Sequence, residues 1–257
     1  MRILCTNDDG VHARGLQSLV TIARAISDDV WVVAPHEEQS GAARALTLTT
    51  PLRVRQYEEK GWSVAGTPTD AVMMAFHKLM PSPPDLVLSG VNNGQNIADD
   101  VTFSGTIAGA LQGMTLGAPS IALSLSRLRR DTARWATAEA LGPAVIRKLL
   151  ETGWPQDVVM NVNFPDRDPD DVAGLEVTRQ GARDRQMLFI EERQDLRGSA
   201  YYWFGYHPQL SNPPEGTDLR AVYDGRISVT PLHLALTHQE SLAGLREAFA
   251  GFETQQR

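Results

Sequence analysis

Cysteine is almost absent from this 257-residue sequence. Cys5 is the only one, so no disulfide bond can form within the chain, which is typical of a protein from a reducing compartment. The sequence also shows no signal-peptide pattern and no apolar run of the about 20 residues that a membrane span requires. We therefore expect a cytoplasmic protein with no membrane partner.

Positive charge is scarce as well. The formal net charge is −7, whereas a protein that coats a nucleic acid polymer needs clustered basic residues. Small anionic substrates stay possible, because a bound metal ion can supply local positive charge. The sequence contains neither a Gly-x-Gly-x-x-Gly pattern nor a Walker lysine, which excludes the two commonest nucleotide-binding loops.

What is present is the composition of an ordinary globular protein, 42% hydrophobic and 21% charged, with alternating strand and helix patterns. Apolar runs that predict buried strands end at acidic, Pro or Ser/Gly/Asn positions, and segments with helical spacing lie between them. We predict an α/β fold with a Rossmann-like, doubly wound and mainly parallel sheet. The predicted strands cover 3–5, 30–34, 85–88, 120–124 and 158–164, with further strand-like alternation in 46–65; the predicted helices cover about 15–26, begin near 67 and 104, and cover 131–150.

The C-terminal part of the sequence has a different pattern. Residues 187–192 and 200–205 predict a long β-hairpin, and four consecutive aromatic residues, Tyr201 to Phe204, are too many for an arm exposed to solvent. Such a cluster indicates a partner surface. We predict a catalytic core in residues 1–180 and a segment in 181–257 that carries an oligomerisation hairpin and then returns to the core through a strand near 227–232.

The first predicted strand runs directly into Asn7, Asp8, Asp9 and Gly10. Ligands of open parallel sheets bind beyond the carboxyl ends of the strands. Two adjacent carboxylates there repel each other unless a cation or a shared proton stabilises them, so Asp8 and Asp9 are candidate ligands of a hard divalent ion. An ordinary turn is the alternative interpretation, because turns use the same residue types.

Three more polar segments are predicted at the same edge of the sheet. Ser40 offers a hydroxyl oxygen and Gly41 an unobstructed N–H after the second strand. The segment 89–96 contains three asparagines, whose side chains can offer a carbonyl to a metal or an amide to an anion. Ser104 is suited to cap a helix whose free N–H groups would form an anion site.

Taken in order, five motifs closely resemble those of the SurE family (stationary-phase survival protein), a family of metal-dependent 5′-nucleotidases. The motifs are Thr6-Asn7-Asp8-Asp9-Gly10, Ser40-Gly41, Gly66-Thr67-Pro68-Thr69-Asp70, the segment from Ser89 to Asn96, and Ser104-Gly105-Thr106. The similarity continues through Gly216-Thr217-Asp218 and Ser228-Val229-Thr230-Pro231-Leu232, so it covers nearly the whole chain.

The resemblance implies one divalent cation per subunit, Mg²⁺ or Mn²⁺, because all the implied donors are oxygens. The implied metal ligands are Asp8, Asp9, Ser40 and Asn92. The implied phosphate-binding residues are Asn96, Ser104, Gly105 and Thr106, to which our own analysis adds the N–H of Gly41. The implied substrates are nucleoside 5′- and 3′-monophosphates and, for some members, short polyphosphate; the implied partner is a second copy of the chain, in a homodimer or homotetramer built through the hairpin.

The resemblance points to phosphomonoester hydrolysis, in which Asp8 is engaged in the chemistry, Asp9 mainly anchors the ion and Asn96 stabilises phosphoryl oxygens. Asp8 acts either as a general base or as a nucleophile. Aspartyl-phosphate phosphatases are disfavoured, because their two aspartates are separated by one residue. A nucleotide-binding regulatory module without turnover is the non-enzymatic alternative.

Two positions depart from the family pattern. Arg14 stands where a proline is usual, and Ala98 replaces a usual glycine. Neither is an implied ligand, but both are expected to alter the shape of the substrate entrance.

Overall fold

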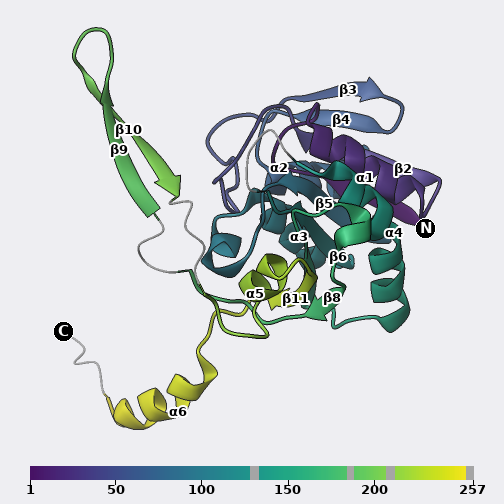
Figure 1. Cartoon of the computed structure of the whole chain (residues 1–257). Helices are drawn as coiled ribbons and strands as arrows, with labels where there is room; N and C mark the ends of the chain where they lie inside the picture. Colours follow the sequence, from purple (N-terminus) through teal and green to yellow (C-terminus); the bar gives the residue numbers. More distant parts are fainter. Residues whose placement is uncertain (128–132, 184–187, 207–211, 253–257) are drawn as a thin grey trace.

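The computed structural model describes residues 1–127, 133–183, 188–206 and 212–252. It contains a nine-stranded sheet with helices on both faces, a separate two-stranded hairpin and a C-terminal helix outside the core (Figure 1). In the described part of the chain, no helix combines the length and the apolar character that a bilayer crossing requires.

The elements follow the predicted alternation of strand and helix. The core strands are β1 (Arg2–Thr6), β2 (Asp29–Pro35), β3 (Val54–Glu58), β4 (Gly61–Val64), β5 (Leu86–Asn93), β6 (Ser120–Leu125), β7 (Val158–Phe164), β8 (Leu175–Val177) and β11 (Ile227–His233). The helices are α1 (Arg14–Arg24), α2 (Pro68–Met74), α3 (Gly105–Thr115), α4 (Trp135–Thr152), α5 (Asp218–Tyr223) and α6 (Gln239–Ala248). Shorter helical segments are η1 (Ala75–Leu79), η2 (Ala98–Thr102) and η3 (Pro169–Asp171).

The strand order is β3-β4-β2-β1-β5-β6-β7-β11-β8. β1 pairs in parallel with both β2 and β5, and β5, β6 and β7 continue in parallel; β3 and β11 supply antiparallel pairs near the two ends of the sheet. The chain thus winds outward from β1 first in one direction and then in the other. The predicted doubly wound, mainly parallel fold is confirmed, and its topological switch point lies between β1 and β5.

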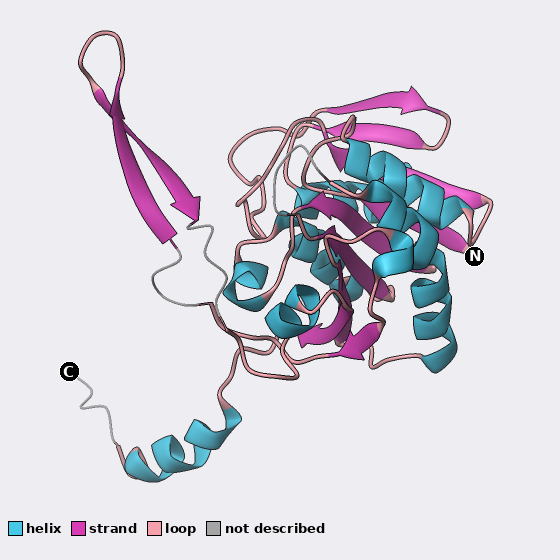
Figure 2. Ribbon diagram, viewed as in Figure 1, coloured by secondary structure: helices cyan, strands magenta, loops and turns pink. Residues whose placement is uncertain are grey.

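Helices cover both faces of the sheet (Figure 2), and buried apolar side chains fill the space between the helices and each face. α1 and α4 pack on one face through residues such as Leu19 and Ile146, which are fully buried. α2 and α3 pack on the other face, through residues such as Val72 and Ile107. Strands that are covered on both faces consist of continuous apolar runs, which is why these strands could be predicted from the sequence.

One predicted strand segment and one predicted strand end were wrong. Residues 46–48 form no strand, because the N–H and hydroxyl of Thr47 both donate to the carboxylate of Asp70 at the start of α2, at 3.1 and 2.6 Å. β5 does not end at residue 88 but continues to Asn93, since the pairing with β6 resumes at Asn92 and Ser124 after an irregularity. The exit of β5 is therefore shorter than the predicted loop at 89–96.

The predicted C-terminal hairpin is confirmed. β9 (Leu188–Gln194) and β10 (Ala200–Tyr206) pair antiparallel, and the hairpin projects away from the sheet (Figure 1). Tyr202, Trp203 and Phe204 expose 59%, 59% and 80% of their surface in the single chain. The start of the predicted helix at 131 and the first hairpin residue, Met187, lie outside the described residues.

Candidate functional site

The candidate site lies at the switch point, beyond the carboxyl ends of β1 and β5. β1 ends at Thr6, and Asn7 then donates its side-chain amide to the carbonyl of Gly10 at 2.9 Å. This closes the turn, and Gly10 adopts a φ of +97°, a conformation that favours glycine. The carboxylates of Asp8 and Asp9 are therefore presented on a turn whose backbone is internally fixed.

Asp8 is a buried carboxylate, with only 4% of its surface exposed. The hydroxyl of Thr106, at the start of α3, donates to Asp8 Oδ1 at 2.6 Å. The pKa of Asp8 is raised to about 7, chiefly because the carboxylate is buried; the Thr106 hydrogen bond acts to lower this pKa, and the neighbouring Asp9 charge acts to raise it. A positive charge at this point would reverse the effect of burial.

Gly105 makes this approach of α3 to the turn possible. A Cβ at position 105 would lie 2.7 Å from Asp8 Cβ and 2.9 Å from Asp8 Oδ2. Glycine is thus required here by contact with the carboxylate, although nothing in its own backbone conformation demands it.

Asp9 is half-buried and faces β5. Its Oδ2 accepts a hydrogen bond from the backbone N–H of Asn93 at 3.3 Å. This bond ties the acidic turn to the end of β5, next to Asn92. The side-chain amide nitrogen of Asn92 donates to the carbonyl of Gly94 at 2.9 Å, which leaves the side-chain oxygen of Asn92 as the group available to a cation.

The segment after β2 reaches the same turn. The N–H of Gln39 donates to the backbone carbonyl of Asp8 at 2.7 Å, which brings Ser40 and Gly41 close to the acidic turn. The Ser40 hydroxyl donates to Glu38 Oε1 at 2.8 Å, so its oxygen lone pairs are available to a metal. Gly41 is exposed, and a Cβ placed on it would meet no atom within 4 Å, so its surroundings are open.

α3 begins as the sequence predicted. Ser104 is the N-cap, and its hydroxyl accepts from the N–H of Ile107 at 3.1 Å. That hydroxyl is thus already used, whereas the N–H groups of Gly105 and Thr106 belong to the first turn, where a helix offers no internal acceptor. The helix start is suited to an anion held beside Asp8.

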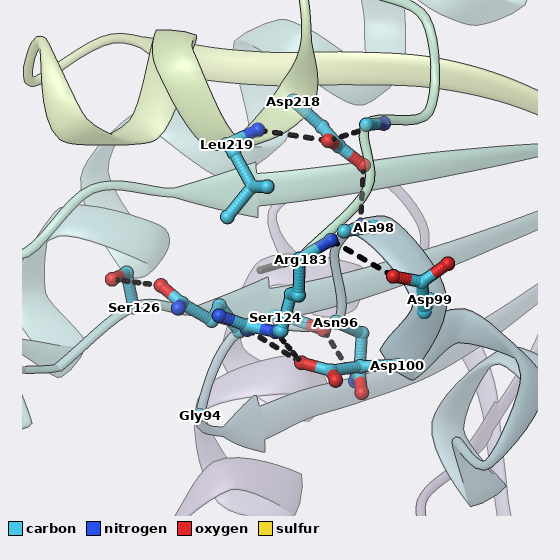
Figure 3. A network of polar contacts seen from close by, with 12 residues as sticks. Gly94, Asn96, Ala98, Asp99, Asp100, Ser124, Ser126, Arg183, Asp218 and Leu219 are labelled. Atoms are coloured by element: carbon cyan, nitrogen blue, oxygen red, sulfur yellow. Dashed lines mark hydrogen bonds and ion pairs between the residues drawn. The ribbon is translucent and has the colours of Figure 1, made fainter. Parts of the chain in front are cut away.

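Asn96 follows β5 and contacts residues of β6 and β7. It is 7% exposed, and its side-chain amide donates to the hydroxyl of Ser124 at 2.9 Å (Figure 3). Its backbone contacts two asparagines of β7: its N–H donates to Asn163 Oδ1 at 2.8 Å, and its carbonyl accepts from Asn163 and Asn161 at 3.1 and 2.8 Å.

The segment that follows Asn96 is fixed by a second buried carboxylate. Asp218, fully buried at the start of α5, accepts from the N–H groups of Ala98, Gly181 and Leu219 at 2.8 to 2.9 Å (Figure 3). Ala98 itself has a φ of +53°, a left-handed conformation that glycine adopts without strain.

Arg183 closes the same network from the hairpin side. Its Nε donates to Asp100 Oδ2 at 2.8 Å, and Figure 3 shows it extended beside Asn96. The two side chains of this ion pair are only 12% and 20% exposed.

The donor set fits a hard cation. Among the described residues, no group of three or more His, Cys, Asp or Glu side chains is placed to hold a metal ion. The candidate donors are instead two carboxylates, a hydroxyl and an amide carbonyl, at Asp8, Asp9, Ser40 and Asn92. Such an all-oxygen set suits Mg²⁺ or Mn²⁺ and offers no soft ligand to zinc or copper.

Contacts of the acidic turn bring the predicted segments around 39, 93 and 106 together with Asp8 and Asp9, whereas the contacts that hold Asn96 are made with β6 and β7. Sequence reasoning missed three residues that hold this arrangement: Asn161, Asn163 and Asp218. The available signal was the pair of asparagines two residues apart in a strand that was otherwise apolar. Alternation places both on one face, inside a predicted core.

Fold and site together define a class: doubly wound α/β proteins with oxygen donors and a helix N-terminus gathered at the switch point. Residues 3–187 match the family model described as "Survival protein SurE". This chain belongs to the SurE family.

Individual relatives agree with this membership. The chain is 60% identical over 255 residues to the 5′-nucleotidase SurE of Caulobacter vibrioides strain NA1000 / CB15N, covering 98% of this chain and 97% of that protein. It is 57% identical to the 5′-nucleotidase SurE of Hyphomonas neptunium, covering 97% and 99%. The crystal structure of the SurE protein from Aquifex aeolicus superposes with a TM-score of 0.85 at 36% identity, covering 96% of this chain and 99% of that one.

Proposed function

We propose that this protein is a 5′-nucleotidase: a phosphomonoesterase that uses one divalent cation, Mg²⁺ or Mn²⁺, to hydrolyse nucleoside 5′-monophosphates to nucleoside and phosphate. Relatives that are 57–60% identical over nearly the full length bear that enzyme name. The observation that carries the proposal is Asp8, a carboxylate buried beside a second carboxylate and a helix N-terminus. Burying such a group is costly unless a cation binds it, and the helix N-terminus is suited to the phosphate.

Asp8, Asp9, Ser40 and Asn92 would hold the cation. When bound, it supplies Lewis acidity at the phosphate and lowers the pKa of water. Thr106 keeps the Asp8 carboxylate in one orientation through its 2.6 Å hydrogen bond. Asp8 then either takes the proton of the attacking water or attacks phosphorus itself, and both roles require an ionised carboxylate.

The phosphate would be bound by neutral donors on two sides. The N–H groups of Gly105 and Thr106 would donate from one side and the side chain of Asn96 from the other, with the N–H of the exposed Gly41 as a further donor. Only one of the two amide hydrogens of Asn96 is used by Ser124, which leaves the second for a phosphoryl oxygen. Preorganised donors of this kind stabilise the charge that develops in the transition state.

We extend the proposal to nucleoside 3′-monophosphates and short polyphosphate, because the donors named above contact only a phosphoryl group. The exposed aromatic residues of β10 support self-association through the hairpin, as a homodimer or homotetramer. Light scattering of the wild type and of a double variant, Trp203→Ser with Phe204→Ser, measures this, since loss of the interface would lower the molecular mass to that of one chain.

The function is tested by phosphate release from AMP with Mn²⁺ or Mg²⁺, with EDTA, and with the Asp8→Asn variant. We expect turnover with the metal and none with EDTA or in the variant. Binding of AMP without phosphate release would instead identify a nucleotide-binding regulatory module. Full activity after exhaustive chelation would remove the metal from the proposal.

A further inference from the structure

β7 carries two asparagines where a core strand normally carries apolar residues. Asn161 and Asn163 both have no exposed surface, and alternation along the strand places them on the same face. Buried amides are unfavourable unless their hydrogen bonds are satisfied. Both side chains direct their nitrogen to the same target, the backbone carbonyl of Asn96.

The contact with Asn163 uses both ends of the amide. Its oxygen accepts from Asn96 N at 2.8 Å, and its nitrogen donates to Asn96 O at 3.1 Å. Asn96 lies between β5 and η2, outside any strand, so it has no ladder partner of its own. The Asn163 side chain therefore takes the place of a neighbouring strand for this single residue.

Asn163 thereby fixes the direction in which the Asn96 side chain leaves the backbone. The Asn96 amide nitrogen contacts Ser124 Oγ at 2.9 Å, and Ser124 is the residue of β6 paired with Asn163 of β7. Two adjacent strands thus hold Asn96: Asn163 of β7 bonds to its backbone, and Ser124 of β6 bonds to its side chain. An amide held at both points presents its remaining hydrogen in one direction only.

We propose that Asn163 is a positioning residue for the phosphate site: it acts through Asn96 and touches no substrate itself. The inference rests on the proposed function, which assigns Asn96 to the phosphate. It adds that the geometry of this contact is set by a side chain 67 residues further along the chain.

A purely structural role for Asn163 is the rival explanation, and the protein contains a control for it. Ser228 pairs with Asn163 across the β7–β11 ladder and is also fully buried. Its hydroxyl hydrogen-bonds with Thr178 at 2.8 Å, whereas the Asn96 hydrogen bonds described above are made with Asn161, Asn163 and Ser124. Ser228→Ala thus removes a buried polar group from the next strand and leaves the Asn96 contacts intact.

The test uses Asn163→Asp, which keeps the size of the side chain but turns the donor facing Asn96 O into an oxygen. We expect kcat/KM for AMP to fall about 10- to 100-fold, because a displaced contact group costs this much. We expect Ser228→Ala to change it less than about 2-fold, even where the two variants lose similar thermal stability.

A double-variant cycle with Asn96→Ala separates positioning from general damage. If Asn163 acts through the Asn96 side chain, Asn163→Asp will have little further effect once that side chain is gone. Equal fold losses in the two backgrounds would overturn the proposal, as would unchanged kcat/KM in the single variant.

Calorimetric binding of inorganic phosphate, with Mn²⁺ present, gives a readout that does not need turnover. We expect at least about 10-fold weaker binding in Asn163→Asp than in the wild type. Equal affinities, or no phosphate binding to the wild type, would overturn the inference. A wild type that binds phosphate through Asn163-dependent contacts but releases none from AMP would refute only the proposed function.

Discussion

The buried carboxylate of Asp8 makes the stability of the metal-free protein depend on pH. Burial raises its pKa from the ordinary value of 3.8 to about 7. The unfolded chain therefore loses the Asp8 proton near pH 4, whereas the folded protein keeps it until about pH 7. The stabilisation associated with this proton is fully present below pH 3.8 and is lost as the pH rises through 7.

The magnitude follows from the size of the pKa change. At about 1.4 kcal/mol per pH unit, the rise from 3.8 to about 7 corresponds to about 4 kcal/mol of unfolding free energy. The Asp8→Asn variant is isosteric and neutral, so it escapes this loss. In EDTA, we expect it to be more stable than the wild type by several kcal/mol at pH 8, and by much less at pH 5.

Urea denaturation at pH 5 and pH 8, with and without Mn²⁺, measures the effect. Other titrating groups are shared by both proteins, so the difference between them isolates Asp8. Mn²⁺ at pH 8 should stabilise the wild type by mass action and leave Asp8→Asn nearly unchanged. The reasoning is refuted if the two proteins show the same pH dependence, or if Mn²⁺ stabilises both equally.

Three further predictions concern single positions. Gly105→Ala places a Cβ 2.7 Å from Asp8 Cβ, so we expect about 1–3 kcal/mol lower stability and much slower phosphate release from AMP. Gly244→Ala is the control, because a Cβ at position 244 meets nothing within 4 Å. Equal activity in the two variants would contradict the prediction. Ala98→Gly relieves about 1–2 kcal/mol of left-handed backbone strain, but it removes a buried methyl group and increases the conformational entropy of the unfolded chain. Because these effects oppose each other, urea denaturation should show a net change in unfolding free energy below about 1 kcal/mol. A loss above about 2 kcal/mol would show that the assumed relief of strain is wrong. The pKa of Asp29 is lowered to about 2, chiefly by the Lys60 hydrogen bond, so its stabilisation is present above pH 3.8 and is lost as the pH falls through 2. Asp29→Asn should cost roughly 1 kcal/mol at pH 7, after discounting for solvent screening, and clearly less at pH 2, where the carboxylate is half protonated; urea denaturation at the two pH values measures this, and an equal cost at both would contradict it.

Local chemistry explains why much of the fold was predictable. β7 occupies the predicted residues 158–164, because an apolar run ended by Pro165 leaves little freedom. α2 begins where predicted, after Thr67, and the structure shows that Thr67 and Asp70 exchange hydrogen bonds as a capping box; α3 begins at the predicted cap, Ser104. In each case the determining contacts lie within a few residues.

What could not be predicted depends on contacts between distant segments. Thr47 was predicted to lie in a strand, but its backbone N–H donates to the carboxylate of Asp70, 23 residues away, and not to a neighbouring strand. The hydrogen bonds of Asn163 with Asn96 could not be predicted, because only the fold brings the two residues together. The parts of the candidate site that the sequence located are those presented by strand ends and helix starts; the side chains that hold them came from the structure.

The hairpin leaves and re-enters the core at two points that lie together. The N–H of Arg179 donates to the carbonyl of Gly216, and the N–H of Asp218 donates to the carbonyl of Arg179, both at 3.0 Å, so the roots of the arm are joined before it departs. β11 then returns to pair with β7, completing the sheet without help from the arm. The arm is thus an insertion whose two ends are fastened to each other: a change in its length or sequence would leave these contacts, and the residues at the switch point, in place.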